Sequence, residues 1–322
     1  MPLTHAKSPL PPTPRIGPVV VVGGANIDIL GTTSGSLVAH DSNPGRIDES
    51  PGGVGRNIAE NLARLGVDTQ LITALGSGSH GRYLAVECAE DGIGTVASLL
   101  VEDLPGSRYL AICDSDGNLE IALSDMRALD RLTPRVLAER GAMIAGAALV
   151  VADCNLPVDS LRWLGDNVTV PLLLDPVSVA KAPRAAGILE KLTALKLNVL
   201  EAGALLGRSI DADCGEEVAA AAAELLAAGV GRVFITLGWR GVFAADASGH
   251  LSFPAPETVV ANVTGAGDAF SAGVVYATLA DMSLSATAAF GSAMAALALE
   301  SRRTVSRAVN LETALTRSEE LL

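Results

Sequence analysis

Short apolar runs alternate with helical patterns along most of this chain. The runs are rich in Val, Ile and Leu, and helical stretches such as the Ala-rich segment 216–228 separate them. Such βα alternation predicts an α/β fold in which a parallel sheet is covered by helices on both faces. In a sheet of this kind, ligands bind beyond the carboxyl ends of the strands. The strands that we expect are 19–22, 70–75, 148–152, 171–175, 199–200 and 232–237.

A hairpin pattern interrupts this alternation. Two alternating segments, 107–113 and 119–123, flank the turn sequence Asp-Ser-Asp-Gly-Asn at 114–118. Asp-Gly and neighbouring Asn residues favour tight turns between antiparallel strands. The polar segment 31–50 also carries weak strand signals. We therefore expect these segments to leave the main sheet and form a small separate one.

Composition and charge limit the possible functions. The chain has 322 residues, 49% of them hydrophobic and 3% aromatic, which predicts a large aliphatic core. Its formal net charge of −13 argues against nucleic acid as a partner, although glycine-rich loops can still bind a nucleotide. The four cysteines are far apart without C-x-x-C spacing, and the four histidines form no ligand pair. A zinc site is therefore not expected.

Neither the N-terminus nor the most apolar segment has the pattern of a membrane element. Residues 1–18 are rich in proline with two basic residues and lack an apolar core, which predicts a disordered tail rather than a secretory signal. The segment 269–299 is interrupted by Asp281 and by Ser and Thr, which favours two buried helices over a membrane span. We expect a cytoplasmic protein with a single domain over 19–315.

The sequence Asn-Val-Thr-Gly-Ala-Gly-Asp at 262–268 leads into an apolar helical stretch. A helix N-terminus carries unpaired N–H groups and partial positive charge, and glycines let an anion approach the backbone. Asp268 would repel a bound phosphate unless it removes a proton from an attacking hydroxyl. Gly265, Ala266 and Gly267 beside this acid therefore point to phosphoryl transfer. The structural alternative is a glycine-rich turn before a core helix.

A second group of polar residues and glycines follows the first expected strand. Asn26 and Asp28 carry side chains that can bind vicinal hydroxyls, or they are ordinary turn residues. Gly52, Gly53 and Asn57 lie in the loop Gly-Gly-Val-Gly-Arg-Asn, which opens a helix and would admit a sugar close to the backbone. An ordinary loop is the alternative.

Two further motifs lie between these loops and the 262–268 run. Asn198 and Glu201 are three residues apart, and Glu201 could orient Mg²⁺ through water, since Mg²⁺ needs few protein ligands; a surface acid is the alternative. The sequence Thr-Leu-Gly-Trp-Arg-Gly at 236–241 could hold nucleotide phosphates, with Arg240 as charge partner, or could be a turn between strands.

Taken in this order, the motifs resemble the ribokinase-like, or PfkB, family of carbohydrate and nucleoside kinases. The resemblance covers about residues 19–310 and depends on 52–57 and 264–268, with Asn198, Glu201 and 236–238 between them. It implies a three-layer α/β/α sandwich with a small β-sheet lid from about 31–50 and 98–125. It also implies ATP and Mg²⁺ as cofactors, and a homodimer, because lid sheets in this family can pair between subunits.

Within the family, the chain is most similar to the pseudouridine kinases. The similarity depends on 51–61, 175–181 and 262–269, together with 124–126 before 132–134. It implies an ATP-dependent phosphotransferase that phosphorylates the ribose 5′-hydroxyl of pseudouridine, giving pseudouridine 5′-phosphate and ADP.

The resemblance also implies a role for each candidate residue. Asp268 is the expected general base, and the amides of Gly265, Ala266 and Gly267 would stabilise the transferring phosphoryl group. Glu201 would hold Mg²⁺ through water. The expected substrate contacts are Asn26, Asp28, Gly52, Gly53, Asn57, Asp125 and Lys181, the last two near the base. The expected nucleotide contacts are Ser178, Asn198, Thr236, Gly238 and Gly241.

Some alternatives stay open at this point. Asn262 stands where several family members have an acid that helps bind a monovalent cation, and an amide is a weaker ligand, so potassium activation is not implied. The acceptor could be another nucleoside or sugar, such as adenosine, ribose or a fructose-type sugar. A catalytically silent nucleotide- or sugar-binding regulator is a further alternative. A dinucleotide enzyme is disfavoured because the first strand precedes Gly-Gly-Ala-Asn instead of G-x-G-x-x-G.

Overall fold

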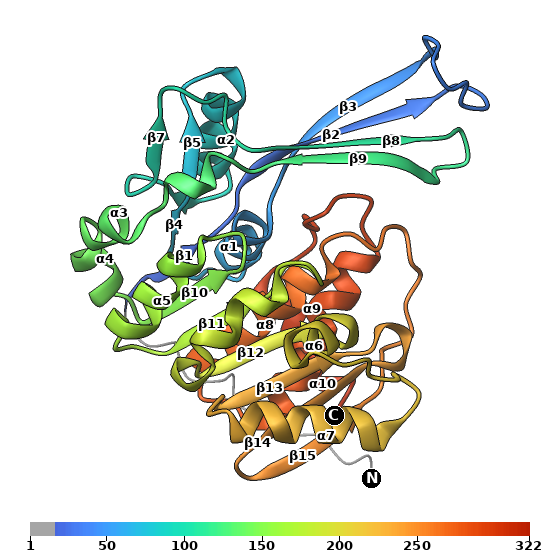
Figure 1. Ribbon diagram of the computed structural model, residues 1–322. Coiled ribbons are helices and arrows are strands. Elements are labelled where there is room, and N and C mark those ends of the chain that lie inside the picture. The colour runs from blue at the N-terminus through green and yellow to red at the C-terminus, as the bar shows by residue number, and fades with distance from the viewer. Residues whose placement is uncertain (1–16) are drawn as a thin grey trace, which may run out of the picture.

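A nine-stranded sheet forms the centre of the protein in a computed structural model that describes residues 17–322 (Figure 1). The strands are parallel except for the strand next to one edge, which runs antiparallel to both of its neighbours. In spatial order the strands are β15 (Gly249–Phe253), β14 (Val242–Asp246), β13 (Arg232–Thr236), β12 (Ala194–Asn198), β11 (Leu172–Asp175), β10 (Leu149–Asp153), β1 (Val19–Val22), β4 (Thr69–Ile72) and β6 (Ile93–Gly94). The predicted tail at 1–18 lies almost wholly outside the described residues.

Strand β1 is buried on both faces of the sheet, and such burial is why the sequence of a central strand is an unbroken apolar run. Its four valines have no exposed surface. Side chains alternate across a strand, so Val19 and Val21 pack with one hydrophobic cluster, and Val20 and Val22 pack with another. Both faces of the sheet are therefore buried under helices.

Helices form a layer on each face of the sheet (Figure 1). One layer contains α3 (Pro134–Ala138), α4 (Gly141–Ala145), α5 (Val158–Asn167), α6 (Val199–Leu206) and α7 (Gly215–Ala227). The other contains α1 (Val54–Arg64), α8 (Ala266–Leu279) and α9 (Leu284–Leu299), with α10 (Leu311–Glu319) packed outside α9. These layers confirm the predicted α/β/α sandwich.

Helices α8 and α9 confirm the prediction of two buried helices over 269–299. Small residues bring them close together, since a Cβ at Gly273 would lie 2.8 Å from the Cα of Gly291. Tyr276 and Phe290 stack between them with ring centroids 5.0 Å apart. Within residues 17–322, no helix combines the length and the apolar character needed to cross a membrane.

A separate four-stranded sheet extends from the upper edge of the body (Figure 1). It contains β3 (Gly45–Gly52), β2 (Asn26–Thr33), β8 (Arg108–Cys113) and β9 (Leu119–Asp125), in that order, and we call it the lid sheet. The β8–β9 hairpin and its turn confirm the predicted hairpin. The sheet starts earlier than the expected 31–50 and leaves out 98–107, because β7 (Leu99–Val101) pairs with β5 (Ala74–Gly76) beside α2 (Ser79–Glu90).

Two predicted strands differ from the structure. The run 70–75 is divided at Thr73 into β4 and β5, and only β4 belongs to the main sheet. The predicted strand at 199–200 is wrong, because β12 ends at Asn198 and Val199 begins α6. A short apolar run fits a strand or a buried helix equally well, and here the Asn198 and Glu201 capping pair starts a helix.

The order of the strands places the candidate site. Strand β1 lies between β10 and β4, so the chain connections diverge to opposite sides between β1 and β10. Such a switch point opens a crevice at the carboxyl ends of the strands. Asn26, Asp153 and Asp175 all follow or end strands at this crevice.

Candidate active site

The N-terminus of α8 carries the candidate base. Gly265 is the residue before the helix and has φ +87°, a conformation that favours glycine, and a Cβ there would overlap the carbonyl oxygen of Thr304. Asp268 lies in the first turn of the helix. The Nδ2 of Asn57, from the first turn of α1, donates to Asp268 Oδ2 at 2.8 Å. Two predicted motifs 211 residues apart therefore meet at one carboxylate.

Burial raises the pKa of Asp268 to about 7, and the nearby carboxylate of Asp175 adds to this rise. The hydrogen bond from Asn57 and the charge of Lys196 act in the opposite direction and lower the pKa. A carboxylate with a pKa near neutrality is suited to accept a proton from a hydroxyl group at physiological pH.

Lys196, which the sequence analysis did not select, lies beside this helix terminus. Its Nζ donates to Asp175 Oδ2 at 3.1 Å, and both side chains are buried. A Cβ at Gly267 would lie 2.8 Å from the same Nζ. The glycine therefore leaves room for an ammonium group next to the α8 amides, where an anion would bind. The available signal was a lysine in a strand that is otherwise apolar.

Asp175 also lies at the site, although the sequence indicated no role for it beyond its place in the segment 175–181. Its Oδ2 also accepts from Ser271 Oγ at 2.8 Å, and its Oδ1 accepts from the Val177 amide at 2.9 Å. Val177 has φ +70°, which is strained for a β-branched residue. Strained backbone of this kind is concentrated at functional sites. Ser271 and Val177 thus fix the carboxylate that holds Lys196.

Asp153, at the end of β10, joins the two N-terminal glycine loops. Its Oδ2 accepts from the amides of Gly24 (2.7 Å) and Gly55 (2.9 Å). A Cβ at Gly53, where φ is +100°, would lie 2.7 Å from the Cα of Ala25. The glycines let the loops pack on one another, and this close packing positions the start of α1.

The predicted sugar-binding residues of the first strand and the second loop lie together. Asn26 Nδ2 donates to Asp28 Oδ1 at 2.6 Å, and a Cβ at Gly52 would overlap the Asp28 carboxylate. Burial raises the pKa of Asp28, while Asn26 and Arg56 oppose the rise. Asn26 and Asp28 belong to β2, at the root of the lid sheet, rather than to a turn after β1.

Lys181 and Asp125 occupy different environments. Lys181 Nζ donates to Asn155 Oδ1 at 2.5 Å, and burial lowers its pKa. Asn155 lies against Gly24, so this ammonium is at the same crevice as the first loop. Asp125, at the end of β9, is held by Arg127 (2.8 Å) and Arg108 (3.4 Å), which keep its pKa well below the usual range.

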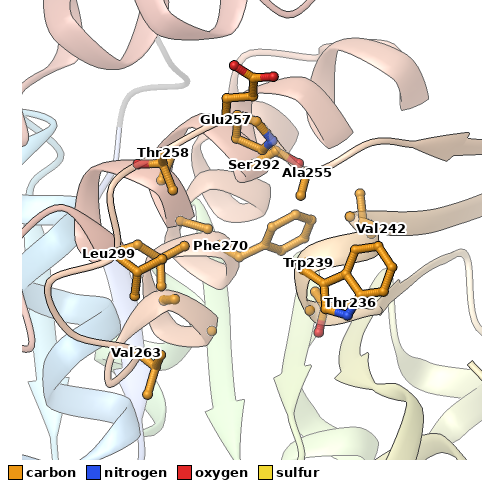
Figure 2. Close-up of a pocket in the computed structure, with 18 residues that line it drawn as sticks. Thr236, Trp239, Val242, Ala255, Glu257, Thr258, Val263, Phe270, Ser292 and Leu299 are labelled. Atoms are coloured by element: carbon orange, nitrogen blue, oxygen red, sulfur yellow. The ribbon is translucent and has the colours of Figure 1, made fainter.

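A largely apolar pocket of about 630 Å³ lies on the other side of the α8 N-terminus (Figure 2). Thr236, Gly238 and Gly241 line it, as three of the predicted nucleotide contacts. Ala266 and Gly267 line it as well, so the candidate anion-binding turn borders this pocket directly. The other lining residues include Trp239, Val242, Phe270, Ser292 and Leu299, which Figure 2 shows around the cavity.

Other predicted nucleotide contacts do not line this pocket. Ser178 follows β11 and Asn198 ends β12, farther along the crevice. Arg240 forms an ion pair with Asp213 and lies over the Trp239 ring at 4.3 Å from its centroid, so its charge is already compensated. Asn262 Oδ1 accepts from the Thr264 amide at 3.0 Å, which engages its side-chain oxygen within the loop.

Asn198 and Glu201 form a capping box at the start of α6. Asn198 Oδ1 accepts from the Glu201 amide (2.9 Å), and Glu201 Oε2 accepts from the Asn198 amide (2.8 Å). Burial and the charge of Asp175 raise the pKa of Glu201. Its Oε1 accepts from no backbone amide within residues 17–322, and a Mg²⁺-bound water could donate to it. No cluster of three metal-ligating side chains is present in the same range.

Together the fold and this site indicate a phosphotransferase that acts on an alcohol: a candidate base and a helix N-terminus suited to an anion lie between a polar crevice and a nucleotide-sized pocket. The pfkB family carbohydrate kinase model matches residues 18–310. The chain belongs to the pfkB family and is a carbohydrate or nucleoside kinase.

Individual proteins are similar over nearly the whole chain. Pseudouridine kinase of Escherichia coli is 38% identical over 283 residues, covering 87% of this chain and 90% of that protein. A carbohydrate kinase from Agrobacterium tumefaciens is 30% identical with a TM-score of 0.84, covering 95% and 98% of the two chains. Arabidopsis thaliana ribokinase, solved with ribose and ATP, is 23% identical with a TM-score of 0.84, covering 94% and 99%, and shares the fold.

Proposed function

We propose that this protein transfers the γ-phosphoryl group of ATP to the ribose 5′-hydroxyl of pseudouridine. One observation carries the proposal. The first turn of α8 borders the apolar pocket through Ala266 and Gly267, and one residue later Asp268 bonds Asn57 on the sugar side. A hydroxyl and a phosphate brought together at this turn are in place for in-line transfer.

We assign a residue or a group of residues to each step of the reaction. Asp268 accepts the proton of the attacking 5′-hydroxyl. The amides of residues 265–268 and the Lys196 ammonium stabilise charge on the transferring group. Asn26, Asp28 and Asn57, with the glycines at 52 and 53, hold the ribose. Closing of the lid sheet would exclude water, which competes with the sugar hydroxyl for the phosphoryl group.

The site also fits the expected cofactors. The apolar cavity bordered by Thr236, Gly238 and Gly241 suits a purine nucleotide, and Glu201 has one oxygen available for a water of Mg²⁺. Mg²⁺ would neutralise charge on the phosphates. The sequence does not imply potassium activation, and a cytoplasmic location stays a prediction from the sequence.

Pseudouridine as acceptor is supported by the Escherichia coli relative and by two groups near the sugar site. Lys181 lies at the crevice beside Asn155, and Asp125 lies at the root of the lid sheet. We propose that both face the base. The test is ADP release with MgATP against pseudouridine, uridine, adenosine, ribose and fructose. Selective turnover of pseudouridine supports the proposal, while preference for another acceptor keeps the kinase chemistry and removes the assigned base contacts.

The lid sheet supports a homodimer. Ile121 and Leu123 point to one face of β9, and each is about 60% exposed. Ile47 on β3 is 72% exposed. An apolar sheet face of this kind is covered by a partner in many proteins. We propose a second copy of this chain, and light scattering of wild type against Ile121→Arg tests it: a dimer converted to a monomer supports the proposal, and a wild-type monomer contradicts it.

A further inference from the structure

The side-chain amide of Asn57 lies between two charged groups of opposite sign. Arg56 Nη1 donates to Asn57 Oδ1 at 3.2 Å, and Asn57 Nδ2 donates to Asp268 Oδ2 at 2.8 Å. A guanidinium has only donors and a carboxylate has only acceptors. The two neighbours therefore admit a single orientation of the amide, with its oxygen toward Arg56 and its NH₂ group toward Asp268.

Arg56 is held in place by two carboxylates. Its Nη2 contacts Glu60 Oε2 at 2.7 Å and Asp91 Oδ2 at 2.9 Å, and its side chain is 5% exposed. Arg64 binds the opposite oxygens of the same two acids, Glu60 Oε1 at 2.6 Å and Asp91 Oδ1 at 3.1 Å. An arginine can be buried only when counter-charges compensate it, and this cluster provides them.

We propose that Arg56 is a positioning residue that keeps the NH₂ group of Asn57 directed at the Asp268 carboxylate. The proposal deepens the proposed function and depends on Asp268 being the base. Arg56 touches neither the base nor the apolar pocket, so it acts through Asn57.

The orientation matters when the base takes up a proton. Protonated Asp268 has an O–H group that would donate to a carbonyl oxygen, and a freely rotating amide would turn its oxygen toward it. That arrangement would stabilise the acid form and remove the base. With Arg56 in place, Asn57 can only donate, so it favours the ionised form. The other charged groups that act on Asp268 are Asp175, Lys196 and Asp153, from β11, β12 and β10.

The chain offers a matched control, because Arg56 and Arg64 share both acids but only Arg56 reaches Asn57. Arg56→Met and Arg64→Met each leave Glu60 and Asp91 with one arginine. We expect Arg56→Met to lower kcat about tenfold, the loss that follows from one hydrogen bond to a charged group. Arg64→Met should stay within about twofold of wild type. Equal losses in the two variants would overturn the proposal.

A double variant tests whether the effect passes through Asn57. The effects of substitutions at residues that act through one another are not additive. In an Asn57→Ala background, Arg56→Met should cause no further loss of kcat, and a second full tenfold loss would contradict the proposal. Arg56 also lies close enough to Asp28 to lower its pKa. A change confined to KM for the nucleoside would therefore indicate an effect on ribose binding and would also count against positioning.

A measurement without turnover separates this proposal from the proposed function. Titration of ¹³C-labelled aspartate in the ligand-free protein reports Asp268 directly. We expect its midpoint to move up by about half a unit or more in Arg56→Met and to stay unchanged in Arg64→Met. Arg56→Lys, whose single ammonium lies between Glu60 and Asp91, should show the same shift if Arg56→Met does not fold. An unchanged midpoint in the Arg56 variants refutes the proposal even if the wild type phosphorylates no nucleoside.

Discussion

Asn57 and Asp268 are joined by a 2.8 Å hydrogen bond, although 211 residues separate them in the chain. Each lies in the first turn of a helix, α1 or α8, and each follows a glycine-rich loop. The two helices pack on the same face of the sheet, so their N-termini open toward the same crevice. This contact brings the proposed substrate loop and the proposed anion-binding turn into one site.

Asp268→Asn should remove the general base while keeping the shape of the site. We expect kcat to fall by about 10²–10⁴-fold, the contribution usual for a positioned base. Binding of ATP should change little, because the apolar pocket is lined by other residues. Steady-state kinetics and calorimetric titration with ATP check this. Turnover near the wild-type level would exclude Asp268 as the base.

The activity should depend on the ionisation of Asp268. Since its pKa is raised to about 7, the fraction in the base form grows as pH rises through 7. We expect kcat/KM to increase about tenfold per pH unit below 7 and to level off above it. Asn57→Ala removes a hydrogen bond that lowers this pKa, so its acid limb should move to higher pH. A profile flat from pH 5 to 8 would contradict the assignment.

The same carboxyl group should cost stability when it is ionised. Its folded pKa is raised above the ordinary value of 3.8, so the folded state binds the proton more tightly than the unfolded state. Stability is therefore lost as pH rises from about 4 to about 7 and is constant above. The free energy of unfolding of Asp268→Asn should rise relative to wild type by roughly 1–2 kcal/mol between pH 5 and pH 8. The gain is smaller than the full pKa shift would give, because Asp268 is partly exposed and solvent screens its charge.

Urea unfolding at pH 5 and pH 8 measures this difference in the free energy of unfolding. Asp116→Asn, at an exposed turn of the lid sheet, is the control, and its effect should be similar at both values. A gain for Asp268→Asn that is larger at pH 5 would have the wrong sign.

Gly267→Ala should displace the Lys196 ammonium, since the new Cβ would lie 2.8 Å from Nζ. Asp175 tethers this lysine, so it cannot simply move away. We expect kcat to fall about 10–100-fold, because small misplacements of charged groups have large kinetic effects. Gly215→Ala, at the first turn of α7 with no atom within 4 Å of the new Cβ, should leave kcat unchanged. Similar kinetics in both variants would remove Lys196 from the mechanism.

Local sequence was sufficient where local chemistry decides the structure. The four valines of β1, the Asp-Gly turn of the lid hairpin and the helix after Gly265 follow from patterns within a few residues. The strand expected at 199–200 failed because an apolar dipeptide has no period of its own. Strand β5 was merged with β4 because pairing partners, which lie far away in the chain, determine where a strand leaves a sheet.

Residue type and spacing are enough to predict the α/β class, the family and the two glycine-rich loops. The contacts of Lys196 with Gly267, of Asp153 with two loop amides, and of Arg56 with Asn57 are visible only in the folded chain. No local sequence pattern shows which groups form these contacts, because their proximity results from the packing of the folded chain. A buried charged side chain needs a counter-charge or a hydrogen-bond partner close to it. Which residue provides that partner depends on distance in space rather than distance along the chain.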